Sequence, residues 1–158
     1  MAETLALDDQ PFDLHEELHG HYIEDLTVGM SAFYSRTMTE ADIVLFAGIS
    51  GDFNPLHLNR EFSEKTQFGG CIAHGMLTAS LISTVVGTKL PGPGAIYLSQ
   101  SLRFTAPVRA GDTVTARARV IEVVAEKRRC RLETGCTVGG ETVVQGEALM
   151  LVPSRAPA

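Results

Sequence analysis

The chain has 158 residues, of which 44% are hydrophobic and 20% are charged, a balance typical of one globular domain and not of a disordered protein. Its formal net charge is −6, and it contains no long run of lysine and arginine. Because nucleic acid would repel such a chain, we expect no nucleic-acid partner.

The cysteines and the apolar segments indicate where in the cell the protein is expected. Three cysteines, Cys71, Cys130 and Cys136, lack the spacing of a disulfide framework, so we expect free thiols in a reducing compartment. The first residues lack the basic and apolar regions of a signal peptide, and no apolar stretch approaches the roughly 20 residues of a membrane span. These features predict a cytoplasmic protein with no membrane contact.

Residues 1–27 are acidic and weakly patterned, and we interpret them as an N-terminal extension. Within them, residues 15–19 read HEELH and match the H-E-x-x-H zinc motif. A zinc site on this motif needs a stable helix, a third ligand and burial, whereas Gly20 follows immediately in a polar stretch. We therefore predict no metal here, and we keep a chelator-sensitive metallopeptidase as an alternative.

Residues 31–38 have the pattern of a β-strand, and a helix is predicted to follow them. Thr39 and Asp42 are three residues apart and form the sequence signature of a capping box, which marks the start of that helix. The apolar residues behind them supply one helical face. We expect the helix to end at Gly48.

The next segment, residues 51–57, reads GDFNPLH. Pro55 disfavours the helical conformation for Asn54, which predicts a bent or extended segment and not a helix. Such a bend can bring the carboxylate of Asp52 and the imidazole of His57 to one small volume, where the pair can move a proton near neutral pH. The alternative from residue types alone is an ordinary turn, in which Asp52 caps a backbone amide and His57 is a surface histidine.

Two further helices are predicted before the chain changes its period. Asn59 is expected to cap a short helical turn through Phe62. Residues 72–87 form the most apolar predicted helix, and a helix that is apolar on nearly every side is usually buried. The sequence KLPGPG at residues 89–94 ends this central helix.

From residue 96 onward, apolar and polar residues alternate with the period of a β-strand. We predict one long strand up to Pro107, followed by strands over residues 113–120 and 130–138. Gly139-Gly140 then forms a hairpin turn into a last strand at residues 143–152. Four consecutive antiparallel strands after a buried helix predict an α+β domain, in which a curved antiparallel sheet wraps around one long central helix.

The start of the central helix, residues 73–76, is the second stretch that could carry chemistry. The first N–H groups of a helix are unpaired, and Gly75 has no Cβ to hold a thioester carbonyl away, so its amide could bind an oxyanion. Alternatively, Gly75 only allows close packing, and His74 is a packing residue. Ser83 lies two turns further along the same face and could reach the same pocket or bond to its own helical turn.

Together these residues resemble a known family. The segments GDFNPLH (51–57), HGM (74–76), residues 96–104, PV (107–108) and GD (111–112) are similar to those of the MaoC-like (R)-specific enoyl-CoA hydratases. The resemblance covers about residues 28–152. We therefore divide the chain into an N-terminal extension (1–27), a MaoC-like domain (28–152) and a C-terminal tail (153–158).

The resemblance implies roles for individual residues. Asp52 and His57 correspond to a catalytic acid–base dyad, and Gly75 corresponds to the amide that binds the oxyanion. Ser83 corresponds to a serine that supports the dyad, although Ser80 is close enough to compete for this assignment. The residues that flank these positions are candidates for binding the substrate: Asn54, His74 and Met76.

The resemblance also implies a hot-dog fold, a homodimer or dimer of dimers, and acyl-CoA or acyl-carrier-protein thioesters as substrates. Adding water to a trans-2-enoyl thioester needs a base, a proton for C2 and stabilisation of enolate charge, but no cofactor. An acyl-CoA thioesterase of the same fold is one alternative. Another is a non-catalytic acyl-thioester-binding module, which would need Gly75 but not both Asp52 and His57.

Overall fold

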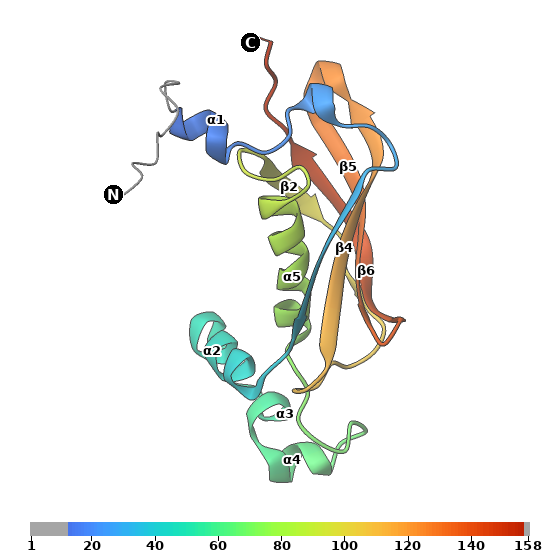
Figure 1. Ribbon diagram of the computed structural model, residues 1–158. Helices are drawn as coiled ribbons and strands as arrows, with labels where there is room; N and C mark the ends of the chain where they lie inside the picture. The colour runs from blue at the N-terminus through green and yellow to red at the C-terminus, as the bar shows by residue number, and fades with distance from the viewer. Residues whose placement is uncertain (1–12, 157–158) are drawn as a thin grey trace, which may run out of the picture.

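The computed structural model describes residues 13–156, so residues 1–12 of the predicted extension and residues 157–158 of the predicted tail lie outside the described part. One six-stranded antiparallel sheet curves around helix α5, Gly75–Thr88 (Figure 1). The strand order is β1-β4-β5-β6-β2, and the short strand β3 also pairs with β6. The predicted architecture, a curved sheet around one central helix, is confirmed.

The bounds of the elements follow the chain in order. The strands are β1 Ser31–Thr37, β2 Ile96–Gln100, β3 Arg103–Phe104, β4 Thr113–Val124, β5 Arg129–Val138 and β6 Glu141–Leu151. The other α-helices are α1 Leu14–Leu18, α2 Glu40–Ser50, α3 Pro55–Leu58 and α4 Arg60–Glu64, and two 3₁₀ turns cover Ile23–Asp25 and Ala125–Lys127. Across residues 13–156, no helix combines the length and the apolar character that a membrane crossing requires.

Apolar packing between α5 and the sheet forms the core. The buried residues of α5 are Thr78, Ala79, Leu81, Ile82, Val85 and Val86. On β4, every second residue from Val114 to Val120 is buried, as the alternating pattern predicted. Burying one valine, leucine or isoleucine side chain contributes about 1.5–3 kcal/mol, so this interface is the main source of stability.

All three cysteines are free thiols, as predicted. Cys130 and Cys136 point into the core from β5 and are fully buried. Burial disfavours the thiolate and raises the pKa of Cys130 to about 11 and that of Cys136 to about 12. These two thiols therefore serve as small core side chains and not as nucleophiles.

Local caps were predicted correctly, but two helix boundaries were wrong. Thr39 and Asp42 form the capping box, yet α2 runs past Gly48 to Ser50. Gly51 ends it because it adopts the left-handed conformation (φ 75°), which glycine reaches at little cost. The central helix begins at Gly75 and not at residue 72, because its first residues are drawn into the loop that contacts α3.

The predicted long strand after residue 96 is divided into β2 and β3. The carbonyl oxygen of Ser101 lies where a Cβ of Gly146 would be, only 1.8 Å from that position. The chain therefore stays beside β6 in the same register, with the Ser101 N–H donating to Glu147 O at 2.9 Å, but it approaches Gly146 very closely before strand pairing resumes at Arg103. The missing side chain at Gly146 is what permits this close approach, and a strand pattern alone does not reveal it.

The described part of the predicted extension packs against the domain. Ile23 and Leu26 are buried in the core, with 3% and 5% of their surface exposed. The Gly20 N–H donates to Pro93 O at 2.9 Å, and the Ile23 N–H donates to Pro153 O at 2.8 Å. Residues 20–26 are thus part of the folded unit and lie beside the C-terminal end of the chain.

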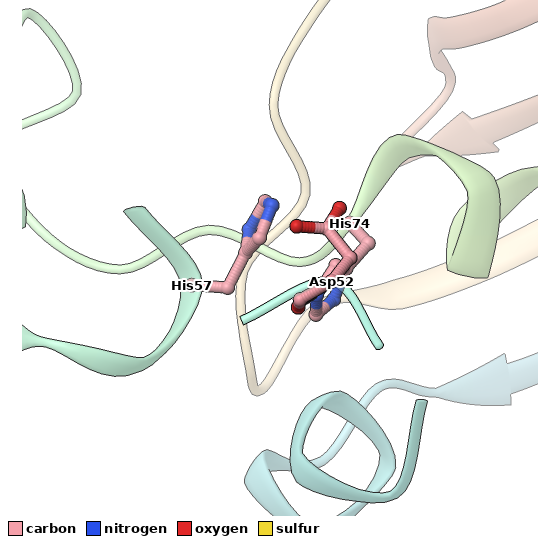
Figure 2. Close-up of side chains that lie close together, drawn as sticks. All are labelled: Asp52, His57 and His74. Carbon is pink, nitrogen blue, oxygen red and sulfur yellow. Dashed lines mark hydrogen bonds between the residues drawn. The ribbon is translucent and has the colours of Figure 1, made fainter. Parts of the chain in front are cut away.

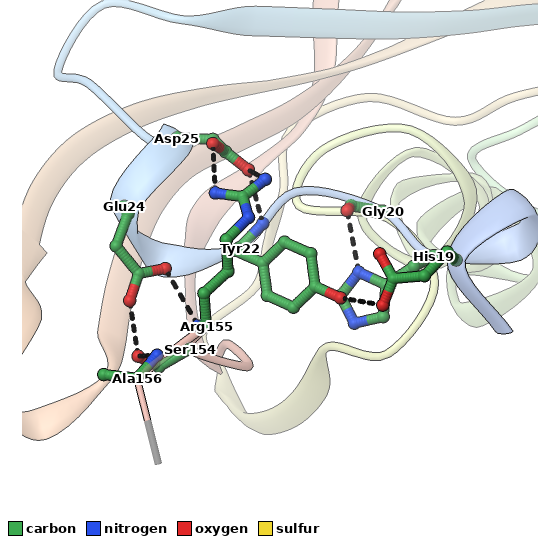
Figure 3. Close-up of polar contacts among 9 residues, drawn as sticks. His19, Gly20, Tyr22, Glu24, Asp25, Ser154, Arg155 and Ala156 are labelled. Atoms are coloured by element: carbon green, nitrogen blue, oxygen red, sulfur yellow. Dashed lines mark hydrogen bonds and ion pairs between the residues drawn. The ribbon is translucent and has the colours of Figure 1, made fainter.

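A cluster of polar side chains joins residues 22–25 to residues 154–156 (Figure 3). The Arg155 guanidinium donates to both carboxylate oxygens of Asp25, at 2.7 and 2.9 Å, and lies over the Tyr22 ring. Glu24 accepts hydrogen bonds from the Ser154 hydroxyl and from the Arg155 N–H. Hydrogen bonds from Arg155 lower the pKa of Asp25, and the bond from Ser154 lowers the pKa of Glu24.

We expect Arg155→Ala to loosen this junction without unfolding the protein. Exposed ion pairs contribute little, so the thermal midpoint should fall by no more than about 4 °C. Hydrogen exchange at the Ile23 amide should become faster. Arg129→Ala, an exposed arginine with no carboxylate partner within residues 13–156, is the matched control.

Acid should have the same effect on the parent protein. Because the folded-state pKa values of Asp25 and Glu24 are lowered, their stabilisation is present above about pH 4 and is lost as the pH falls through the folded values. An unchanged protection factor at the Ile23 amide, which corrects for the pH dependence of exchange in an unfolded chain, both in Arg155→Ala and at pH 3 would show that apolar packing and the bond to Pro153 O hold the segment without the ion pair.

Candidate active site

The C-terminus of α2 positions Asp52. The carboxylate oxygen Oδ1 of Asp52 accepts a hydrogen bond from the Asn54 N–H at 3.2 Å, and the Asp52 N–H donates to the Ser50 hydroxyl. These bonds close a tight turn immediately after the left-handed Gly51. The predicted bend is present, and its aspartate is exposed to solvent.

The second half of the segment differs from the prediction, because it contains one helical turn, α3. Asn54 caps this turn by accepting the Leu56 N–H at 3.1 Å. Pro55 occupies the first helical position, where its missing N–H costs no hydrogen bond. Pro55 keeps Asn54 out of the helix, as expected, but starts a helix itself, and His57 lies on that helix.

The structure brings Asp52 and His57 together, and it adds His74 to them (Figure 2). One side-chain oxygen or nitrogen atom from each of the three lies within 4.8 Å of the others. Across residues 13–156, this is the one group of three such side chains that could hold a metal ion. Asp52 is exposed, His57 is partly buried, and only 2% of His74 is exposed.

A hydrogen bond determines which ring nitrogen of His57 carries the proton and which can accept one. His57 Nδ1 lies 2.8 Å from the carbonyl oxygen of Ile72. A carbonyl oxygen only accepts, so Nδ1 carries the proton and donates it. The lone pair of neutral His57 is therefore on Nε2, and this atom can accept a proton from a bound molecule.

Gly75 is the first residue of α5, and His74, its N-cap, makes no side-chain capping bond. The N–H groups of the first turn have no partner within the helix. The Gly75 backbone is not in the left-handed region, so a positive φ does not explain the glycine. Instead, the Phe104 ring lies against it, and a Cβ at Gly75 would be 2.9 Å from two ring carbons.

A cavity of about 480 Å³ lies beside Asp52, His74 and Gly75, whereas His57 is not among the residues that line it. Asp52, His74 and Gly75 contribute to its wall, as does Met76. The remaining wall is mainly apolar and includes Phe68, Ile72, Phe104, Pro107 and Val108. A polar, proton-transferring end in an otherwise apolar cavity suits a small acyl group with one reactive polar function.

The other predicted site residues have different surroundings. The amide oxygen of Asn54 is used to cap α3, and Met76 lines the cavity with 57% of its surface exposed. Ser83 is exposed on α5, two turns from Gly75, and is absent from the residues that line the cavity. Ser80 donates to the Leu77 carbonyl oxygen within its own helix, at 2.6 Å.

The HEELH motif has the features of a short surface turn. It lies on α1, a helix of five residues with none buried. His19 Nδ1 contacts the Gly20 carbonyl oxygen at 2.8 Å, and the His19 ring stacks on Tyr22 at 4.1 Å.

A second hollow, of about 960 Å³, lies over β4, β5 and β6 and is lined by Arg103, Arg117 and Arg119, away from Asp52 and His74.

Sequence reasoning did not place His74 beside the dyad. It assigned His74 to substrate binding or packing, because nothing local connects it to residues 22 positions earlier. Its position directly before Gly75 was the one available signal, since the two residues share the end of α5.

Comparisons with known proteins agree with this geometry. The family described as "MaoC like domain" matches residues 28–144. An (R)-specific enoyl-CoA hydratase of Rhodospirillum rubrum is 53% identical over 140 residues, which cover 89% of this chain and 97% of that protein. A 3-hydroxybutyryl-CoA dehydratase of Methylorubrum extorquens is 51% identical over 139 residues, covering 88% of each protein.

A solved structure is similar over the same region. The R-hydratase PhaJ1 from Pseudomonas aeruginosa, in its unliganded form, superimposes with a TM-score of 0.81 and is 44% identical in sequence. The match covers 86% of this chain and 88% of that chain. The curved sheet and central helix are therefore those of a hot-dog fold.

Proposed function

Because the chain belongs to the MaoC-like dehydratase family and is a hydro-lyase of the (R)-specific enoyl-CoA hydratase type, we propose that Asp52, His57 and the Gly75 amide carry its reaction. The reaction adds water to a trans-2-enoyl-CoA and forms the (R)-3-hydroxyacyl-CoA. One observation supports the assignment most: the Asp52 carboxylate lies close to the His57 imidazole, and Asp52 and Gly75 line the same cavity.

In the proposed mechanism, one water molecule binds between Asp52 and His57. The Asp52 carboxylate accepts a hydrogen bond from one O–H of this water molecule and so orients the water. His57 Nε2 removes the other proton as the water oxygen bonds to C3 of the substrate. His57 then delivers this proton to C2, so the hydrogen and the hydroxyl add to the same face, and His57 returns to its neutral form.

The Gly75 amide acts on the other side of the substrate. As the C3–O bond forms, negative charge moves to the thioester oxygen, and an N–H aimed at that oxygen stabilises the transition state. The positive end of the α5 dipole adds to this effect. The reaction as proposed uses no metal and no redox cofactor, and coenzyme A enters only as part of the substrate.

The free thiols support a cytoplasmic location, where thiols remain reduced.

We also propose that the protein is a homodimer. Strand β2 is an edge of the sheet, and it exposes Ile96 (56%), Tyr97 (36%) and Leu98 (43%). An open edge with exposed apolar side chains favours pairing with another chain, and a second copy presents the same edge.

The dyad is tested by substitution. We expect Asp52→Asn and His57→Gln each to lower kcat by about 10²-fold or more, since each removes a positioned proton-transfer group. The double variant should lose less than the product of the single losses, because the two side chains act on one water molecule. Turnover is followed by loss of the conjugated-enoyl absorbance, and the product enantiomer is identified by chiral chromatography.

His15→Gln removes an exposed histidine outside the site and is the matched control, which should keep full turnover. A well-folded dyad variant with parental turnover would remove that residue from the mechanism. Release of free coenzyme A instead of a hydroxyacyl thioester would identify a thioesterase.

Gly75→Ala tests the oxyanion amide, with Phe104 as a necessary control. The added Cβ should lower kcat by roughly 10²–10³-fold by blocking the approach of the thioester oxygen. The protein should still fold, because Phe104 is half exposed and its ring can move away from the Cβ. Gly75→Ala is also made in a Phe104→Ala background and compared with Phe104→Ala alone. There the added Cβ no longer meets the Phe104 ring, but it still stands in the way of the thioester oxygen.

A persistent loss of kcat in the Phe104→Ala background therefore supports the oxyanion role. Recovery of both thermal midpoint and kcat would show that Gly75 is present for packing against Phe104.

The dimer is tested at the edge strand. We expect the parent protein to sediment as a dimer at micromolar concentration and Ile96→Lys to shift it towards the monomer, because a charge would be buried at the interface. Phe62→Lys, at an exposed position of α4, is the control and should not change the mass. A fully active monomeric parent protein would contradict the proposal.

A further inference from the structure

His74 joins the two segments that carry the proposed dyad. Its Nε2 lies 2.9 Å from the backbone carbonyl oxygen of Asp52. Because that oxygen only accepts, Nε2 carries a proton and donates it. This bond ties the turn after α2 to the N-terminus of α5, across 22 residues of sequence.

The other nitrogen of His74 has an unusual environment. Nδ1 is buried and has no hydrogen-bond partner among the described residues. A second proton there would be a buried donor without an acceptor, which is costly, so the structure fits the neutral Nε2–H tautomer. An unpaired buried nitrogen is rarely retained for packing alone, since an apolar ring would fill the same space without this cost.

The His74 ring also supports His57. The two imidazole rings lie 3.7 Å apart, measured between centroids, and are tilted by 31°. The Phe46 ring also lies near His74, with the two ring centroids 5.0 Å apart. His57 therefore has two contacts that restrict its ring: the Ile72 carbonyl, which accepts from its Nδ1, and the buried, hydrogen-bonded ring of His74.

We propose that His74 is the positioning residue of the active site, which fixes Asp52 through its backbone and His57 through its ring, in register with the Gly75 amide. This inference rests on the proposed function. The role assigned to His74 is indirect: it sets the distance between the group that orients the water, the group that moves the proton and the amide that binds the oxyanion. A displacement of about 1 Å in such an arrangement can cost up to about 10²-fold in rate.

Two amide substitutions separate the hydrogen bond from the burial. In His74→Gln, the side-chain amide nitrogen is the same number of bonds from Cα as Nε2 of histidine, so it can still donate to the Asp52 carbonyl. In His74→Asn, the amide nitrogen corresponds to Nδ1 and is one bond too short. His74→Phe keeps the ring against His57 but removes the donor.

We expect His74→Asn and His74→Phe to lower kcat by roughly 10–100-fold, with KM for a short trans-2-enoyl-CoA changed less than about threefold. His74→Gln should recover at least tenfold of the loss seen in His74→Asn. Activities are referred to folded protein, well below each thermal midpoint. Equal kcat in all three variants and the parent, or losses that follow only the thermal midpoint, would overturn the proposal.

A spectroscopic measurement keeps the inference testable if these variants fold poorly. In the ¹⁵N-labelled parent protein, His74 should show a protonated Nε2 and an unprotonated Nδ1, with slow exchange of the Nε2 proton. A protonated Nδ1 or fast exchange would overturn the proposal. A parent protein that shows this signature but hydrates no enoyl-CoA would instead contradict the proposed function, so the two failures are distinguishable.

Discussion

The position of α5 in the concave face of the sheet is the constraint on which the rest of the structure depends. Its buried side chains pack against β1, β4 and β5, and each buried aliphatic residue contributes about 1.5–3 kcal/mol. A helix held along most of its length cannot rotate or slide by itself. Its first turn, with the unpaired N–H groups and Gly75, is therefore held at one place on the edge of the core.

The proposed site forms where residues 52–57 meet residues 72–74, which lead directly into that fixed helix end. His57 donates to the carbonyl oxygen of Ile72, just before α5, and His74 donates to the carbonyl oxygen of Asp52. Each segment thus supplies an imidazole donor and a backbone acceptor to the other. The arrangement leaves the Asp52 carboxylate and His57 Nε2 unused by these bonds, which is the condition for both to act on a substrate.

Two kinds of histidine cluster occur in this chain, and their surroundings distinguish them. The HEELH segment has metal-ligand spacing but lies on a five-residue helix with no buried residue. In the cluster at Asp52, sequence spacing connects Asp52 and His57 but not His74, and its members come from three segments and include a nearly fully buried imidazole. Burial and convergence of separate segments are better indicators of a functional site here than spacing within one segment.

The sequence by itself determined what depends on neighbouring residues. The capping box at Thr39, the cap at Asn59, the Gly139-Gly140 hairpin and the alternation on β4 each involve contacts within a few positions, so their patterns were readable. The signature around Asp52 and His57 identified the family for the same reason.

Only the tertiary structure decided how distant segments meet. It placed His74 against Asp52 and His57, set Phe104 against Gly75, brought Ser101 close to Gly146, and packed Ile23 into the core. These contacts join residues separated by 17 positions or more, and their geometry follows from how α5 is seated in the curved sheet. No local propensity encodes that placement, because it is the sum of many apolar contacts over the whole domain.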